Sequence, residues 1–383
     1  MLQRAWDHGW TTVPSLNPEV LVRKAVGQAG ADPDEDDVGW RSRLEQLCAD
    51  LQNHSKLNNL GRTLAHGQIV SALSSRFRAH ALWRKYQVIE EQRLSAPIII
   101  VGQMRSGSTR MQRLLACDPR LTYTRFYESW NPVPAGCRRP GLDGRKMKAW
   151  MGLACARLLN PAFGTMHPTS YNAPDEEIGL HNLSIFGTAF EVQYHVPNYT
   201  AAVERDDPVP VYREFRRLLQ MLRWLRIDRS DRPWILKVPQ FSQDLPALLQ
   251  VFPDARLIFL SRDLDSVIAS SALLVRNQMS LQSDDLDPPR IEREWTRKVR
   301  LREARMNAAK TIAEVPQVDV RYQDVSDDWE REMLRVYEML NLPLSDDVKA
   351  RMASYLHASQ PAHHGRRKNQ IGRNSSLFDC PPL

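Results

Sequence analysis

A stretch of small and hydroxylated residues, Val101–Thr109 (VGQMRSGST), contains the residue types best suited to hold an anion. It follows an apolar run and precedes a helical pattern, so its backbone N–H groups would face a ligand at a helix N-terminus. Ser106, Ser108 and Thr109 add hydroxyl donors. Arg105 adds a forked guanidinium that stays charged. The stretch predicts a phosphate-like anion site, and an ordinary turn capped by Ser and Thr is the alternative.

This loop lacks the Lys of GxxxxGK[ST], the residue that reaches the nucleotide phosphates in P-loop kinases and NTPases. A magnesium-dependent kinase or NTPase is therefore disfavoured. The chain shows no residues at zinc-ligand spacing, so we expect no metal centre.

A second candidate anion site lies in Leu260–Ser270 (LSRDLDSVIAS). Arg262 stands at the end of an apolar run, and Ser270 falls within the helical pattern that follows. Because open parallel sheets bind ligands at the carboxyl ends of their strands, these two residues could hold a second phosphate. The alternative is a surface pair between Arg262 and Asp265, beside a buried serine.

The elements that must position these residues follow from the hydrophobic pattern. Short all-apolar runs are typical of buried parallel strands, and here they alternate with helical patterns. This alternation predicts a three-layer α/β fold in which helices flank a parallel sheet. Residues 1–95 read as helical, so we expect an N-terminal helical cap and an α/β domain over residues 96–383 with a basic tail. The Pro- and Gly-rich stretch Asn131–Gly144 predicts a long functional loop. The expected strands are Pro97–Val101, Trp234–Val238, Arg256–Ser261 and Val318–Tyr322.

Composition bounds the class of protein. The 383 residues carry 52 Lys and Arg against 45 Asp and Glu, a net charge of +7, which favours an anionic partner. With 42% hydrophobic and 25% charged residues, the chain is neither a disordered tail, a collagen nor a coiled coil. Five cysteines without a CxxC pair predict reduced thiols. The first residues lack an apolar signal region and no apolar run approaches a membrane span, so we expect a cytoplasmic protein.

Taken together, the two candidate anion sites resemble the paired phosphate site of the sulfotransferases that use 3′-phosphoadenosine 5′-phosphosulfate (PAPS). Residues 102–120, GQMRSGSTRMQRLLACDPR, are similar to the GxPRSGTTLLxxLLxxHP form of the bacterial and tyrosyl-protein branches. Residues 233–270 are similar to the LKxP…L…L…FPDAR…RD…V…S block of the same family. Met104 and Leu264 stand where the family usually has Pro. The resemblance implies a P-loop-like α/β fold.

The resemblance also assigns cofactor-binding residues. The residues it assigns to the 5′-phosphosulfate are Arg105, Ser106, Gly107, Ser108 and Thr109. Arg262 and Ser270 would bind the 3′-phosphate. A basic Gly-containing loop late in the chain covers that phosphate in relatives, and the candidate here is His364–Lys368, with Arg366 and Arg367. A solvated basic tail is the alternative for this segment.

Sulfuryl transfer to a hydroxyl needs a base and cations near the leaving group. The His that serves as base beside the second strand of cytosolic relatives is missing, because no His occurs between Lys237 and Leu260. Glu128 stands where the tyrosyl-protein and glycan-modifying branches have a catalytic Glu, and its alternative is an ion pair with Arg125. Lys237 matches a family Lys beside the transferred group.

A third segment, Met166–Glu177 (MHPTSYNAPDEE), is similar to an HP…PEE segment of the bacterial branch. It offers His167 as the second choice of base, with Glu176 or Glu177 orienting the ring. An ordinary solvent-exposed loop His is the alternative.

The sequence therefore predicts a PAPS-dependent sulfotransferase that modifies a hydroxyl, or less favourably an amine, and leaves adenosine 3′,5′-bisphosphate. The expected partner is a small-molecule, glycan or lipid acceptor and not a nucleic acid. The competing hypothesis is a non-catalytic or degenerate P-loop protein that binds a nucleotide or another anion.

Overall fold

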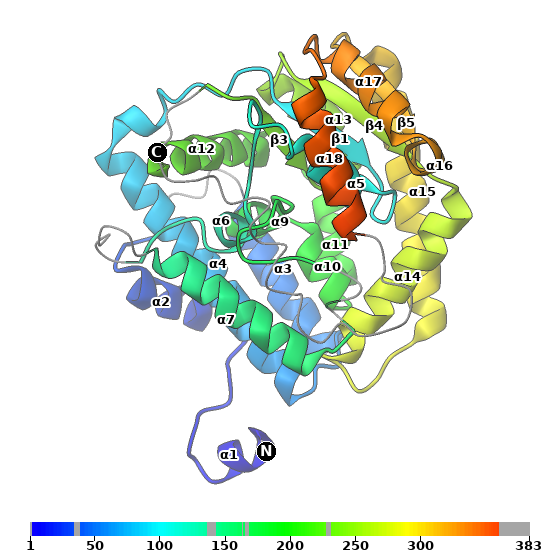
Figure 1. Ribbon diagram of the computed structural model, residues 1–383. Coiled ribbons are helices and arrows are strands. Elements are labelled where there is room, and N and C mark those ends of the chain that lie inside the picture. The colour runs from blue at the N-terminus through cyan, green and yellow to red at the C-terminus, as the bar shows by residue number, and fades with distance from the viewer. Residues whose placement is uncertain are drawn as a thin grey trace.

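The centre of the molecule is a five-stranded sheet whose strands are all parallel, in the order β2-β3-β1-β4-β5 (Figure 1). The computed structural model describes residues 2–33, 39–135, 143–162, 164, 168–226 and 231–359. The predicted α/β class and parallel sheet are confirmed. The strands are β1 (Ile98–Gly102), β2 (Thr122–Tyr123), β3 (Trp234–Lys237), β4 (Arg256–Ser261) and β5 (Gln317–Arg321).

The four predicted strands form β1, β3, β4 and β5. Every residue of β1 and β3 is buried, as expected for central strands covered on both faces. The sequence did not reveal β2, because it has only two residues, both half-buried and without an apolar run. Its place is fixed by the backbone, where the Thr122 N–H donates to the carbonyl of Pro233 (2.9 Å).

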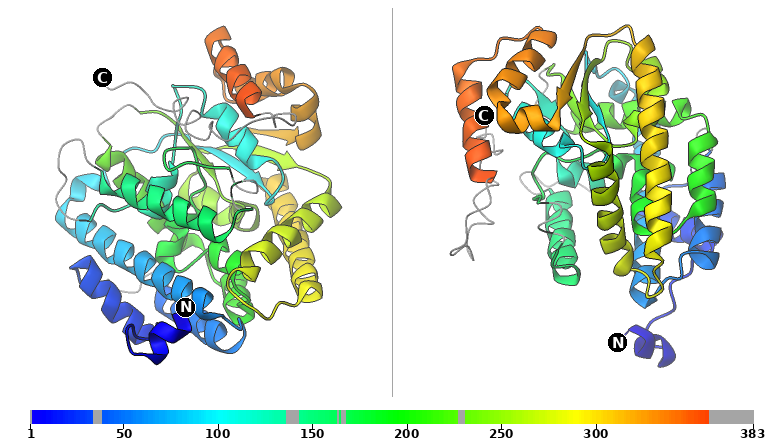
Figure 2. Two further views of the ribbon diagram at one scale, coloured as in Figure 1. Left: turned by 60° about the horizontal axis from the view of Figure 1, so that its bottom comes forward. Right: turned by 90° about the vertical axis from the view of Figure 1, so that its right-hand side faces the viewer.

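Successive side chains of β1 point to opposite faces of the sheet and so belong to two different hydrophobic cores. Ile98 and Ile100 pack on one face of the sheet, and Ile99 and Val101 pack on the other, as the two-residue period of a strand requires. Figure 2 shows helices on both sides of the sheet. The first face is covered by α5 (Ser108–Leu115), α17 (Trp329–Met339) and α18 (Asp346–Ser359). The second is covered by α12 (Val209–Leu225), α13 (Phe241–Val251) and α15 (Pro288–Ile312).

A third core joins the N-terminal helices to a segment from the middle of the chain. The helices are α2 (Pro18–Ala29), α3 (Trp40–Asn53) and α4 (Asn59–Lys85). Their apolar side chains, from Leu16 to Phe77, pack with residues between Ile185 and Val211. That segment includes α10 (Thr188–Gln193) and α11 (Pro197–Arg205). Residues far apart in sequence therefore complete one hydrophobic cluster.

The long helix α4 begins earlier than its hydrophobic pattern indicates. The pattern is clear from Leu73 onward, whereas Gly61 and Gly67 interrupt it before that point. The structure explains Gly61, because a Cβ there would lie 2.0 Å from the carbonyl oxygen of Gln282. The side chain of Asn58 caps the helix by accepting from the Gly61 N–H (2.8 Å).

The remaining elements connect these layers. They are α1 (Leu2–Asp7), η1 (Gln87–Ile89), α6 (Phe126–Trp130), α7 (Gly144–Leu159), α9 (Ile178–His181), η2 (Asn182–Ser184), α14 (Leu264–Ser280) and α16 (Tyr322–Asp327). Among the described residues, no helix combines the length and the apolar composition needed to cross a bilayer. The described cysteines, Cys48, Cys117 and Cys155, are all free thiols.

Candidate active site

The predicted anion loop connects the end of β1 to the start of α5. Its backbone turns through two left-handed residues, Arg105 (φ 69°) and Gly107 (φ 93°). The hydroxyl of buried Ser106 donates to the carbonyl of Gln103 (2.7 Å) and closes the turn. Glycine is required at position 107, because a Cβ there would lie 2.5 Å from the ring of Tyr322. The loop therefore holds its N–H groups at the N-terminus of α5 in a fixed shape.

The second predicted anion element lies directly beside this loop. The parallel register of β1 and β4 pairs Gly102 with Leu260 and so brings the two strand ends together. The guanidinium of Arg262 donates to the carbonyl of Arg105 (3.0 Å), and the Arg105 Nε donates to the hydroxyl of Ser270 (3.0 Å). Three residues from the two predicted anion elements thus meet where β1 and β4 end.

A hollow of about 410 Å³ opens next to Arg262. The ring of Tyr322 lies beneath the Arg262 guanidinium, whose central carbon is 4.7 Å from the ring centre. Tyr322 was not expected at the site, although its position at the end of the predicted strand Val318–Tyr322 could have signalled it. The hollow is lined by Ser261, Arg262, Asp263, Ser266, Arg321, Tyr322 and Gln323.

Lys237 brings β3 into the same site. Its side chain is almost fully buried, and its Nζ donates to the carboxylate of Glu176 and to the hydroxyl of Thr109 (3.3 Å). The ion pair with Glu176 offsets the cost of burying the ammonium group. Thr109 belongs to the anion loop, so the Lys237 ammonium group lies beside the predicted phosphosulfate site.

The segment that carries Glu176 is held from two sides. The Tyr127 N–H donates to the carbonyl of Tyr171 (3.0 Å), and the Gln112 side chain donates to the carbonyl of Asp175 (3.0 Å). The hydroxyl of Ser129 in α6 donates to the Glu176 carbonyl (2.7 Å). Both α5 and α6 therefore fix the position of this carboxylate beside Lys237.

Glu177, the next residue, is fully buried behind Lys237. Its Oε2 accepts from the Lys237 backbone N–H (2.8 Å). Burial raises the pKa of Glu177 to about 8, although the hydrogen bond from Lys237 opposes this. At neutral pH the folded protein therefore keeps a proton on Glu177.

This proton makes a testable contribution to stability. In the unfolded chain Glu177 loses its proton near its ordinary pKa of 4.5, whereas the folded state keeps the proton up to about pH 8. The folded state binds more protons in this window, so the Glu177 contribution to the free energy of unfolding falls as the pH rises. As the pH rises from 4.5 to about 8, the free energy of unfolding of a Glu177→Gln variant should therefore fall less than that of the wild type. Urea unfolding at several pH values measures this, and parallel curves would contradict the assignment.

Glu128 lies in a different environment from Glu176. Its side chain is 1% exposed, and its oxygens accept from the Arg125 N–H (3.0 Å) and from the Arg226 Nε (2.9 Å). Burial alone would raise the pKa of Glu128, but the charges and hydrogen bonds of Arg226 and Arg125 lower it to about 2. The sequence offered an ion pair between Glu128 and Arg125 as the alternative to a catalytic role, and this ion pair is present (3.6 Å). Arg226 forms a second ion pair with Glu128 (2.5 Å). The role of Glu128 as base stays a prediction.

Three predicted residues lie outside the described part of the chain, namely His167, Arg366 and Arg367. Their proposed roles as second-choice base and 3′-phosphate cover stay predictions. Within the described residues, no group of three or more His, Cys, Asp and Glu side chains is placed to hold a metal ion.

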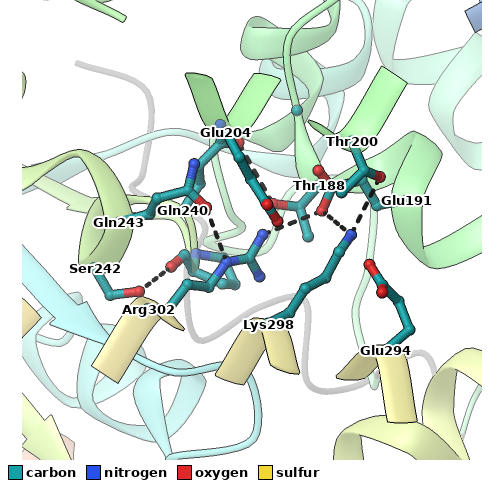
Figure 3. Close-up of polar contacts among 12 residues, drawn as sticks. Thr188, Glu191, Thr200, Glu204, Gln240, Ser242, Gln243, Glu294, Lys298 and Arg302 are labelled. Atoms are coloured by element: carbon teal, nitrogen blue, oxygen red, sulfur yellow. Dashed lines mark hydrogen bonds and ion pairs between the residues drawn. The ribbon is translucent and has the colours of Figure 1, made fainter. Parts of the chain in front are cut away.

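A buried ionic cluster joins three of the helices (Figure 3). One oxygen of Glu191 in α10 contacts both Lys298 (2.9 Å) and Arg302 (3.1 Å) of α15. All three side chains are at most 4% exposed. Arg302 also approaches Gln243 of α13 (3.5 Å). The cluster therefore ties α10, α13 and α15 together.

Comparison with known proteins is consistent with this architecture. The crystal structure of sulfotransferase STF9 from Mycobacterium avium superposes with a TM-score of 0.80 at 23% identity, covering 95% of this chain and 94% of that one. The structure of sulfotransferase STF1 from Mycobacterium tuberculosis H37Rv gives 0.79 at 24% identity, covering 90% and 94%. At this level of identity the two structures establish a shared fold. No curated protein sequence matches the chain significantly.

The family assignment comes from the sequence itself. The profile of the sulfotransferase family matches residues 97–346, well over half of the chain. This region contains the anion loop, the Arg262 element and Lys237. Together with the shared fold, the match confirms the predicted relationship, and the chain belongs to the sulfotransferase family.

Proposed function

We propose that the protein transfers a sulfuryl group from PAPS to the oxygen of a hydroxyl acceptor. One observation carries this proposal. Arg105, Arg262 and Ser270 contact one another where β1 and β4 end, and Lys237 contacts Thr109 of the same loop. A donor with two separate phosphate-like groups needs two adjacent anion sites, and the closeness of these residues supports such a pair.

The described residues fit such a donor. The left-handed turn at Arg105 and Gly107 directs the loop N–H groups to the start of α5, where an anion is favoured. Arg262 and Ser270 would hold the 3′-phosphate, beside the hollow in which Tyr322 presents an aromatic ring. When bound, PAPS supplies a sulfuryl group whose S–O bond to the 5′-phosphate breaks as a bond to the acceptor oxygen forms.

Arg105 and Lys237 would stabilise the negative charge that develops on the departing phosphate. Arg105 keeps its charge and does not donate a proton, so its contribution is electrostatic. Lys237 is held by Thr109 and Glu176 with its ammonium group already desolvated. Little reorganisation is then needed when charge develops, which is the condition under which such groups act most strongly.

For the base we propose Glu176 in place of Glu128. The Glu176 side chain is 16% exposed, next to the Lys237 Nζ, whereas both oxygens of Glu128 are occupied by arginines and its side chain is 1% exposed. A base must reach the acceptor proton within hydrogen-bond distance. Glu176 would accept the acceptor's hydroxyl proton as the acceptor oxygen bonds to sulfur, and the contact with Lys237 holds the carboxylate in position.

Calorimetric titration with adenosine 3′,5′-bisphosphate, AMP and ATP–magnesium tests the proposal. We expect the bisphosphate to bind most tightly, and Arg262→Ala to weaken it about ten- to a hundredfold, because a charged hydrogen bond to the 3′-phosphate is lost. Arg300→Ala, which removes an exposed arginine on α15, is the matched control and should bind as wild type does. Equal or absent binding of all three nucleotides would overturn the proposal in favour of a non-catalytic anion-binding protein.

A further inference from the structure

The helix α7 exposes an unusual amount of apolar surface. Of the eleven large hydrophobic side chains exposed among the described residues, five lie on this one helix. The most exposed are Leu158 at 81%, Met147 at 58% and Trp150 at 56%. Met151 and Leu159 complete the set. The function proposed above does not account for this surface.

Four of these five side chains form one continuous stripe. At about 100° per residue, Trp150, Met147, Leu158 and Met151 fall within roughly a third of the helix circumference, with Ala154 between them. The residues of α7 that are buried against the protein, Arg145, Ala149 and Leu153, lie on the opposite side. The stripe therefore points away from the body of the molecule.

Basic residues flank the stripe on both edges. By the same helical spacing, Lys146 and Arg157 lie along one edge and Lys148 along the other. The helix contains no acidic residue, and within the described residues no carboxylate forms an ion pair with these three side chains. Burial, and to a lesser extent the nearby Arg78, lower the pKa of Lys148.

The helix is fixed in place along its length. Arg145 donates to the carbonyl of Pro132 (2.8 Å) near its start, and Asn160 just past its end donates to Asn277 of α14 (2.8 Å). In the middle, Lys148 donates to Ser71 of α4 (3.3 Å). Figure 1 shows α7 on the near side of the molecule, below the sheet and in front of α3. The stripe is thus presented by a rigid element.

We propose that α7 docks the protein onto the surface of an anionic phospholipid membrane. A helix with an outward apolar stripe, a Trp within it and cations at its edges can lie in the membrane interface, where the stripe enters the acyl boundary and the cations meet the phosphates. The cations on both edges suit a surface that is negative throughout, and the apolar stripe between them suits the acyl boundary beneath such a surface. This inference does not depend on sulfuryl transfer.

Co-sedimentation with two kinds of vesicle tests the proposal. We expect wild-type protein to sediment with vesicles of phosphatidylcholine and phosphatidylglycerol, to remain largely in solution with pure phosphatidylcholine, and to be released by added salt. Trp150→Ser with Leu158→Ser should reduce the bound fraction at least tenfold, and so should Lys146→Glu with Lys148→Glu. Matched controls remove exposed groups elsewhere: Leu334→Ser on α17 and Arg300→Glu on α15 should bind as wild type does.

Two results would overturn the proposal. One is absence of sedimentation with either vesicle, or equal sedimentation of wild type and both α7 variants. The other is a stable dimer in solution, seen by analytical ultracentrifugation without lipid and lost in the Trp150→Ser, Leu158→Ser variant, because a second copy would then be the occupant of the stripe. Circular dichroism of each variant shows whether it is folded, so a loss of binding cannot be mistaken for unfolding.

Discussion

Replacing Glu176 with glutamine is expected to lower kcat by about 10²–10⁴-fold, the range that a general base contributes. The amide would keep the shape of the side chain and could still accept a hydrogen bond from Lys237, but it could not take the acceptor's proton. Binding of adenosine 3′,5′-bisphosphate should stay within a few-fold of wild type, because Arg262 and Ser270 are untouched. Steady-state kinetics with any acceptor that the enzyme turns over, beside calorimetry, measures both quantities.

The matched control is Glu128→Gln. Glu128 belongs to α6, where it pairs with Arg125 and Arg226, and the same helix holds the Glu176 backbone through Ser129. We therefore expect this variant to lose stability, seen as a lower Tm, while well below its Tm it keeps a kcat within about tenfold of wild type. The reverse result, with kcat collapsed in Glu128→Gln at an unchanged Tm and retained in Glu176→Gln, would return the base role to Glu128.

Replacing Glu191 with glutamine is expected to cost about 3–5 kcal/mol of the free energy of unfolding. A single oxygen of this carboxylate balances Lys298 and Arg302, and burial leaves neither cation access to water. The amide would leave two buried positive charges next to each other without the carboxylate that pairs with both. Since domains of this kind have a total stability of roughly 5–15 kcal/mol, the loss would be plain in urea unfolding.

Glu90→Gln is the control for the Glu191 measurement. It removes the same charge from an exposed ion pair with Arg217, where solvent screens the interaction, so we expect a loss of about 1 kcal/mol or less. Equal losses in the two variants, or a loss below about 1 kcal/mol for Glu191→Gln, would show that the cluster does not need its carboxylate.

Four of the strands and the anion site were within reach of the sequence because their signals are local. A buried parallel strand is a short apolar run, and an anion loop after it is a string of small and hydroxylated residues, so β1 and residues 101–109 could be placed together. Arg262 and Ser270 followed from the same reasoning at β4. Their meeting with Arg105 depends only on β1 and β4 being neighbours.

The pairing of Glu176 with Lys237 could not be read from the sequence. It depends on the irregular segment before α9 being held by single hydrogen bonds to α5 and α6, and such contacts leave no periodic pattern. The same is true of Glu128, where Arg226 approaches from just past the end of α12 across a long separation in sequence. The position of Tyr322 beneath Arg262 likewise needs the order of β4 and β5 to be known.

The third hydrophobic core also sets an order of events during synthesis. Residues between Leu16 and Phe77 emerge from the ribosome first, yet part of the apolar surface they bury belongs to residues from Ile185 to Val211. The N-terminal helices therefore cannot complete their packing until more than half of the chain has been made. During that interval they carry exposed apolar surface of the kind that chaperones recognise. A nascent chain halted before residue 185 should accordingly be more sensitive to protease in this region than one halted after residue 211.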